Sequence, residues 1–244
     1  MSIKTSTQLT IARSAERGYF DHGWLQTHHS FSFAGYFDPA NQNWGALRVL
    51  NDDVVAPGTG FGTHPHRDME ILTYVLDGEL EHRDSMGNAG VVRPGGVQYL
   101  SAGTGITHSE YNHSAQRPVH FVQMWVVPRA KNLEPRYGQV DFSATDRHNR
   151  WLTIASGEAG ITAPIDLWQD ATAFVARLDE GRLAKPVRAG RFGFLYVATG
   201  EVTLGTQKLG AGDAGRIEGP FEVEVSGTAE LVLWDVPPMP ESAA

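Results

Sequence analysis

Glycine and proline breaks are dense along this chain and divide it into short runs of β-type residues. The 244 residues include 27 Gly and 13 Pro. Between the breaks lie ALRVLND, EILTYVL, ELEHRD, VQYLSA, HFVQMWVV, FGFLYVA, EVTLG, FEVEVS and ELVLWDV. Many short strands separated by turn signals predict an all-β sandwich or barrel fold. Helical patterning is weak, so we expect few short helices, with residues 163–174 as the best candidate.

A faint internal repeat suggests how the strands are divided. YVLDGELEH begins at Tyr74 and YVATGEVTL begins at Tyr196, 122 residues later. A period this long favours two similar domains over a solenoid, with chance similarity between two hairpins as the alternative. In the first copy, Asp77–Gly78 has the composition of a two-residue hairpin turn. We expect one domain over residues 1–133 and a second over residues 134–244.

Composition excludes several classes of function. The net charge of −8 makes the chain a poor candidate for direct contact with a nucleic-acid backbone. With no cysteine, disulfides and thiolate metal sites are excluded. The N-terminal segment lacks the apolar core of a signal peptide, and no run approaches the roughly 20 apolar residues of a membrane span. We expect a cytoplasmic protein that contacts neither nucleic acid nor membrane.

Two histidines flank a proline at the start of a β-type run. In an extended chain, residues i and i+2 point to the same face, so His64 and His66 project in one direction. Pro65 suits a strand start or an edge strand, because it cannot donate to a sheet ladder. One such pair is weak evidence, because surface histidines near turns are common.

A second pair with the same spacing strengthens the case for a metal site. His108 and Glu110 also share a face if their segment is a strand. Two such pairs on neighbouring strands would present three imidazoles and one carboxylate. This set suits one divalent metal such as Fe, Mn, Co, Ni, Cu or Zn, and it leaves coordination positions open for chemistry.

Nine of the ten histidines lie in the first half of the chain. The last of the ten is His148, and the repeat offset carries His64 and His66 onto Pro186 and Arg188. If the two halves are duplicated domains, only the first has kept imidazoles. Any histidine-based metal site therefore belongs to the N-terminal half.

The same residues resemble a known family of metal-binding barrels. The segment from Gly58 to Glu70 resembles the first cupin motif, and the segment from Gly105 to Asn112 resembles the end of the second. More specifically, the chain resembles the pirin family, and within it the bacterial quercetin-dioxygenase-like members. The segments that carry this resemblance are HGWLQTHHSFSFAGYFDP, GFGTHPHRDMEILTYVLDG and SAGTGITHSEYNH.

The resemblance implies two cupin (jelly-roll-like) β-barrels facing each other, with a metal in the N-terminal barrel only. It implies His64, His66, His108 and Glu110 as the metal ligands, with iron as the first expectation. Glu70, at even spacing from His66, is expected to support the ligands rather than to bind the metal. Five further histidines are assigned to surface or structural roles: His28, His29, His82, His113 and His120.

The resemblance also implies an activity. A flavonol such as quercetin would react with O₂ at the metal, with ring opening and release of carbon monoxide, and Glu110 would be the base that accepts the flavonol proton. Two alternatives use the same ligands. One is a regulatory module whose metal shapes a surface for a protein partner, such as a transcription regulator or a metabolic enzyme. The other is a cupin enzyme that acts on a different small molecule.

Overall fold

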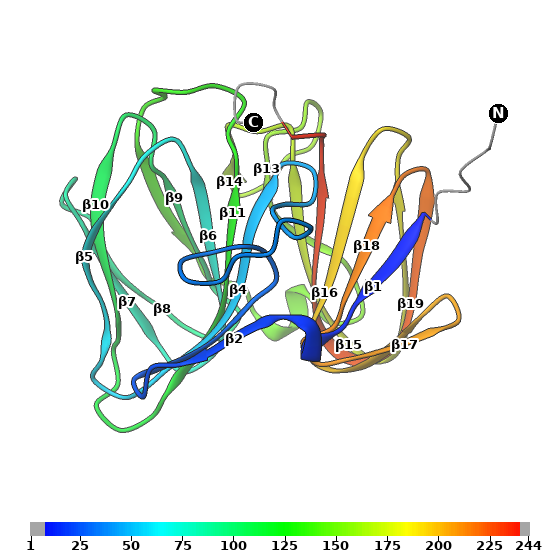
Figure 1. Cartoon of the computed structure of the whole chain (residues 1–244), viewed down its shortest axis with the longest axis horizontal. Coiled ribbons are helices and arrows are strands. Elements are labelled where there is room, and N and C mark those ends of the chain that lie inside the picture. Colours follow the sequence, from blue (N-terminus) through cyan, green and yellow to red (C-terminus); the bar gives the residue numbers. More distant parts are fainter. Residues whose placement is uncertain (1–7, 240–244) are drawn as a thin grey trace.

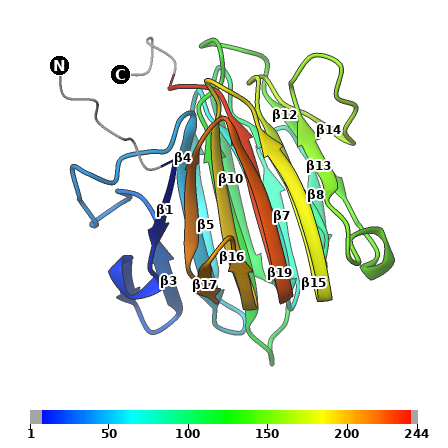
Figure 2. The ribbon, with the colours of Figure 1, turned by 90° about the vertical axis from the view of Figure 1, so that its right-hand side faces the viewer.

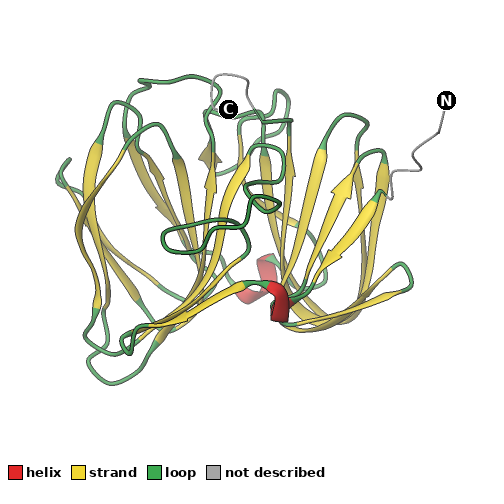
Figure 3. Cartoon of the chain, viewed as in Figure 1, coloured by secondary structure: helices red, strands yellow, loops and turns green. Residues whose placement is uncertain are grey.

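Strands make up nearly all of the regular structure (Figure 3). The computed structural model describes residues 8–239, and over that range it contains nineteen strands and two 3₁₀ helices, η1 (Ser14–Glu16) and η2 (Ala144–Asp146). The predicted all-β fold with few short helices is confirmed. Within this range no helix is long and apolar enough to cross a membrane.

Two facing sheets form the N-terminal barrel. The larger sheet has the order β12-β9-β6-β11-β4-β3-β2 and the smaller has the order β5-β10-β7-β8. The larger sheet comprises β2 (Gly18–Asp21), β3 (Leu25–His29), β4 (Leu47–Val55), β6 (Glu70–Asp77), β9 (Val97–Ser101), β11 (Val119–Val126) and β12 (Arg136–Val140). The smaller comprises β5 (Gly60–His66), β7 (Leu80–Asp84), β8 (Ala89–Val92) and β10 (Ile106–Asn112).

One eight-stranded sheet forms the second barrel. Its main path is β1-β18-β16-β19-β15-β13-β14, and β17 pairs with β16. The strands are β1 (Leu9–Ala12), β13 (Leu152–Ser156), β14 (Ile165–Asp166), β15 (Thr172–Val187), β16 (Phe192–Leu204), β17 (Gln207–Gly210), β18 (Ala214–Glu218) and β19 (Phe221–Val236). The long strands β15, β16 and β19 run side by side (Figure 2). Each pairing contains one register shift, the kind of irregularity that a bulge produces where a sheet bends.

The two barrels lie side by side and share a core (Figure 1). Tyr74 and Met124 from the first barrel pack in the same buried cluster as Tyr196 and Trp234 from the second. The Trp234 indole N–H donates to Met124 Sδ at 3.0 Å. The two cupin barrels implied by the family resemblance are therefore present, with an apolar face between them.

The tyrosines that begin the two repeat copies reach across this interface in opposite directions. The Tyr74 hydroxyl donates to Glu230 of the second barrel, and the Tyr196 hydroxyl donates to Asp52 of the first. Burial, together with the neighbouring carboxylate, raises the pKa of both Tyr74 and Tyr196 well above the ordinary value. Both phenols therefore act as neutral donors that connect the barrels.

Each barrel takes one strand from the opposite side of the expected boundary at residues 133–134. Strand β1 pairs with β18 in the second barrel, where Figure 1 shows it in blue beside orange. Strand β12 pairs with β9 in the first barrel. The boundary itself remains a prediction, but these pairings tie the two halves of the chain together.

Two local expectations are wrong. Residues 163–174 form no helix and instead contain β14 and the start of β15, because Ile165 and Leu167 are buried in the shared core. The Asp77–Gly78 turn does not close a hairpin. Strands β6 and β7 follow one another in sequence, but β6 pairs with β9 and β11, whereas β7 pairs with β8 and β10. The turn passes the chain from one sheet to the other.

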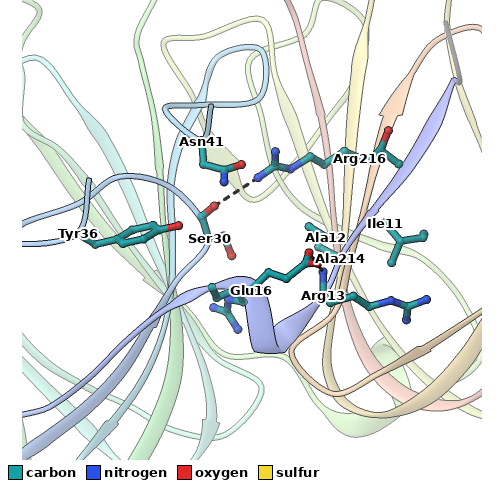
Figure 4. Close-up of a pocket in the computed structure, with 11 residues that line it drawn as sticks. Ile11, Ala12, Arg13, Glu16, Ser30, Tyr36, Asn41, Ala214 and Arg216 are labelled. Carbon is teal, nitrogen blue, oxygen red and sulfur yellow. Dashed lines mark hydrogen bonds between the residues drawn. The ribbon is translucent and has the colours of Figure 1, made fainter. Parts of the chain in front are cut away.

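A cavity of about 150 Å³ lies between the barrels, beside β1, η1 and β18 (Figure 4). At one side of it, Arg216 Nη2 donates to the Ser30 carbonyl at 3.4 Å, which joins the second barrel to the loop after β3. The residues that line it, all within the described range, include no histidine. The candidate metal site lies elsewhere.

Candidate metal centre

Strands β5 and β10 bring the two predicted residue pairs together. They pair antiparallel, with His64 directly opposite His108 and His66 opposite Ile106. The register shifts between His108 and Glu110. Since both strands belong to the smaller sheet, side chains that share its inner face point into the barrel.

Three imidazoles meet inside the N-terminal barrel. The ring centroids of His64 and His108 are 4.4 Å apart, and each lies 4.8 Å from that of His66. One nitrogen from each of the three rings falls within 4.8 Å of the other two. This spacing suits three ligands of one ion.

The first of these rings is oriented by its own strand. His64 Nδ1 lies 2.8 Å from the Gly62 carbonyl oxygen, which can only accept, so Nδ1 carries the proton. The Nε2 atom of His64 is then left with a free lone pair. Such a bond from the other ring nitrogen is the usual way in which proteins orient a metal-binding histidine.

A short relay orients His108 from the opposite side. Asp84 Oδ2 lies 3.2 Å from His82 Nε2, and His82 Nδ1 lies 3.4 Å from His108 Nδ1. If Asp84 accepts from His82 Nε2–H, then His82 Nδ1 accepts from His108 Nδ1–H. His108 Nε2 is buried and has no hydrogen-bond partner among residues 8–239. The relay thus leaves a lone pair on that atom.

Burial keeps two of the rings neutral. Burial, with the neighbouring histidines, lowers the pKa of His108 to about 3 and that of His66 to about 4. Neutral imidazole is the form that binds a metal, so neither ring has to lose a proton at neutral pH.

Glu110 is held by amide side chains from the larger sheet. Gln123 Nε2 donates to Oε2 at 2.9 Å, and Gln98 Nε2 donates to Oε1. The carboxylate is 2 % exposed. It belongs to a second group of three potential ligands, with His108 and His82, that overlaps the three-histidine group. His108 is common to both, so Glu110 lies at the edge of the imidazole cluster.

These residues fit a divalent first-row metal. The donor set offers neutral imidazole nitrogens and one carboxylate, which such ions accept. His108 Nε2 is buried and has no partner in the described part of the chain, although buried polar atoms rarely lack one. A metal ion bound to this nitrogen would explain why it has no partner there. His64, His66 and His108 form one group of potential ligands, whereas Glu110 falls in the second group, so the complete set of four remains a prediction.

Two of the three imidazoles, His64 and His66, line a pocket of about 180 Å³ together with Glu110. Aromatic residues form part of the lining: Phe33, Phe61 and Trp125. The ring of Trp125 meets the His66 ring edge-on at 4.8 Å. A flat ligand could therefore lie against aromatic side chains while one end reaches the imidazoles.

Sequence reasoning missed two buried residues of this pocket. His29 was expected outside it, but it is 4 % exposed and lines the pocket together with Asp53. Burial lowers the pKa of His29 to about 4. Burial raises the pKa of Asp53 to about 7; the Thr27 hydroxyl is near enough to oppose that rise, but the contact lacks the distance and angle of a hydrogen bond. Alternation in NDD, with Asn51 and Asp53 on one face, was the available signal.

Glu70 does not support the candidate ligands as expected. It accepts hydrogen bonds from Tyr99 Oη at 2.7 Å, Ser101 Oγ at 2.6 Å and the Trp168 backbone N–H at 2.9 Å. The chain leaves β5 after His66 and enters a different sheet at β6, so even spacing does not place the two side chains together. Glu70 instead ties the first barrel to the segment between β14 and β15.

Comparisons with known proteins agree with this architecture. The family model described as Pirin matches residues 10–126, and that described as Quercetinase C-terminal cupin domain matches residues 153–236. An *Escherichia coli* K12 protein named quercetin 2,3-dioxygenase is 40% identical, over 94% of this chain and 99% of its own. A pirin-like protein of *Caulobacter vibrioides* is 42% identical, over 89% of this chain and 95% of its own.

Solved structures give the same result. YhhW from *Escherichia coli* superposes with a TM-score of 0.88 at 39% identity, covering 96% of this chain and 99% of its own. A second structure, of the bacterial pirin YhhW in complex with nickel(II), has a TM-score of 0.87 at 38% identity and covers 95% of this chain and 100% of its own. Sequence and fold lead to one conclusion: the chain belongs to the pirin family.

Proposed function

We propose that this protein is a metal-dependent dioxygenase that opens a flavonol such as quercetin. In this reaction both oxygen atoms of O₂ enter the products, and one ring carbon leaves as carbon monoxide. The observation that carries the proposal is the oriented imidazole cluster beside a buried carboxylate, at one end of a pocket with aromatic walls. The names of relatives at about 40% identity support the choice of substrate.

His64, His66, His108 and Glu110 are the proposed ligands of one divalent metal, with iron first among the candidates. When bound, the metal would stabilise the deprotonated hydroxyl of a flavonol and favour electron transfer to O₂. The tasks that remain for the chain are to place the flavonol, accept its proton and exclude water.

Glu110 is the proposed acceptor of the flavonol hydroxyl proton. Its carboxylate lines the pocket, so a substrate oxygen can approach it. Gln98 and Gln123 hold both of its oxygens through N–H donors, which fixes the direction in which the remaining lone pairs point. A carboxylate fixed in this way accepts a proton with little reorganisation.

The pocket positions the flavonol ring system. Phe33, Phe61 and Trp125 offer aromatic surface to a flat ligand. A bound ring displaces water from the imidazole end, so that the deprotonated substrate meets O₂ rather than solvent.

The first test is O₂ uptake with quercetin. Metal-free protein would be reloaded separately with Fe(II), Mn(II), Co(II), Ni(II) or Cu(II), and metal content would be measured beside carbon monoxide release. We expect stoichiometric loading and coupled uptake with at least one metal. His64→Ala is the control, and we expect it to lose both metal and uptake.

The contrary outcomes are distinct. Full activity in a His64→Ala protein that holds no metal would overturn the ligand assignment. Tight, stoichiometric loading with no uptake for any metal would overturn the flavonol reaction. The remaining functions would then be the metal-dependent regulatory module and an enzyme that acts on a different small molecule.

A further inference from the structure

Four polar side chains form one wall of the metal-site pocket. Strands β3 and β4 pair antiparallel, with Thr27 opposite Asp53 and His29 opposite Asn51. All four residues line the pocket together with His64, His66 and Glu110. We call Thr27, His29, Asn51 and Asp53 the polar wall.

Every residue of the polar wall has a buried polar atom left unpaired. Thr27 Oγ1, His29 Nδ1, Asn51 Oδ1 and Asp53 Oδ1 have no hydrogen-bond partner in the part of the chain that the structure describes. Each of the four residues is at most 4 % exposed. Buried polar groups are nearly always paired, because leaving one unpaired costs free energy. Four such atoms on two adjacent cross-strand pairs indicate a surface that binds polar groups.

The polar wall is distinct from the imidazole cluster. Neither group of potential metal ligands within residues 8–239 includes any of its members. Its atoms include acceptors, such as the Asp53 carboxylate and the Asn51 carbonyl, together with the Thr27 hydroxyl, which both donates and accepts. Hydroxyl groups match this mixture, because each can donate to one partner and accept from another.

The size of the pocket limits what it encloses. Its volume is about 180 Å³, which is smaller than the roughly 300–1,000 Å³ of pockets that surround a drug-sized ligand. It therefore encloses only part of a three-ring flavonol, namely the reacting unit and one attached aromatic ring, with the remainder extending through the mouth. The reacting unit would lie at the imidazole end and the attached ring against the polar wall.

We propose that the polar wall is a second anchoring subsite, which recognises hydroxyl groups on the enclosed aromatic ring of the substrate. The substrate class is then a flat aromatic compound that carries hydroxyl groups in addition to those at the reacting unit. This inference rests on the proposed dioxygenase function for the reaction, but the binding step can be measured without turnover.

The test compares two ligands that share the reacting unit. Quercetin carries hydroxyl groups on its outer rings, whereas 3-hydroxyflavone has only the hydroxyl of the reacting unit. Metal-loaded protein would be titrated with each under anaerobic conditions, and kcat/KM would then be measured for each in air. We expect quercetin to bind about tenfold or more tightly than 3-hydroxyflavone, since a net hydrogen bond is worth about that factor.

Two variants test whether the polar wall causes the preference for quercetin over 3-hydroxyflavone. Asp53→Leu and Thr27→Val remove polar atoms of the wall at nearly constant volume, and we expect each to reduce the Kd ratio of the two ligands. Thr172→Val is the matched control, because Thr172 is equally buried but lies in the second barrel, away from the pocket. It should keep the ratio of the unsubstituted protein. If Asp53→Leu does not fold, Thr27→Val decides the matter alone.

The outcomes separate this inference from the proposed function. Equal affinity of the unsubstituted protein for both ligands would overturn the subsite, and so would a ratio that survives in the folded wall variants. In that case the unpaired polar atoms of the wall would bind water and not the substrate. Absence of turnover with both flavonols would overturn the dioxygenase proposal, while a Kd ratio that falls in the wall variants would still support the subsite.

Discussion

Among single residues, the candidate centre also depends on groups outside the proposed ligand set. His82 is fully buried, stacks on Tyr137 with ring centroids 4.3 Å apart, and links Asp84 to His108. The relay fixes which nitrogen of His108 carries the proton. The availability of His108 Nε2 therefore depends on a histidine that the sequence marks only as structural.

We expect His82→Phe to weaken metal binding about 10- to 100-fold, the usual cost of losing a group that orients a ligand. Phenylalanine preserves the stack on Tyr137 but cannot accept from His108. Affinity would be measured by competition with a chelator. His113→Phe is the control, because His113 lies at the surface and bonds to Glu81. Wild-type affinity in His82→Phe would show that the relay does not orient His108.

The polar wall contains two residues whose position could not be predicted from spacing along the sequence. The even spacing of His64 with His66, and of His108 with Glu110, predicts which side chains share a face, and the structure brings the three imidazoles together. The burial of His29 and Asp53 could not be read in the same way. It depends on the pairing of β3 with β4 and on the sheet that faces them, which spacing along one strand does not specify.

At the scale of elements, the close pairing of β5 with β10 sets the geometry of the centre. A Cβ atom on Gly60 would lie 2.3 Å from the Glu110 carbonyl oxygen and 2.5 Å from Tyr111 Cα. Both are backbone atoms that cannot move without shifting β10. A Cβ atom on Gly62 would meet only the Tyr111 hydroxyl, at 3.8 Å. Only the first of these glycines is required by packing.

Gly60→Ala is therefore expected to lower the free energy of unfolding by about 1–3 kcal/mol, the usual cost of overpacking. Gly62→Ala, two residues along the same strand, should change it by less than about 0.5 kcal/mol. Urea denaturation of both variants measures the difference. Equal stability of the two variants would mean that the backbone of β10 can shift at Glu110 at little cost in free energy.

The errors at this scale share a physical cause. The Asp77–Gly78 turn has hairpin chemistry, but each flanking strand finds its partners in a different sheet. Residues 163–174 have some helical character, yet Ile165 and Leu167 are more favourably buried against the other barrel. Local preference indicated the turn correctly and left the partners of the strands undetermined, because those partners are distant in sequence.

At the scale of the whole molecule, buried polar contacts connect the barrels around Asp52. His120 Nε2 lies 2.7 Å from Asp52 Oδ1, and the Tyr196 hydroxyl of the second barrel donates to Oδ2. Burial alone would lower the pKa of His120, but the bond to Asp52 raises it above 6.5. Burial alone would raise the pKa of Asp52, but bonds from His120 and Tyr196 lower it below 3.8.

These shifts define a pH window for stability. The contribution of His120 is complete below pH 6.5 and is lost as pH rises through its raised pKa. That of Asp52 is complete above pH 3.8 and is lost as pH falls through its lowered pKa. We therefore expect His120→Gln to cost about 1–2 kcal/mol near pH 5.5 and less near pH 8.5. Urea denaturation at both pH values measures this.

His113→Gln provides the matched control, because the exposed His113–Glu81 pair should contribute less than about 1 kcal/mol at either pH. A cost of His120→Gln that does not change with pH would mean that the ion pair with Asp52 does not contribute to stability.

The exchange of strands β1 and β12 between barrels has a consequence for how such a protein can be shortened. A gene cut at the expected boundary, between residues 133 and 134, would encode a fragment with the candidate metal site that lacks the edge strand Arg136–Val140, and its companion would lack Leu9–Ala12. Each product would expose an unpaired sheet edge, which invites aggregation. A lineage that needed only the histidine-bearing barrel could not discard the other by a single truncation. The second half of the chain therefore supplies structure that the metal-site barrel needs.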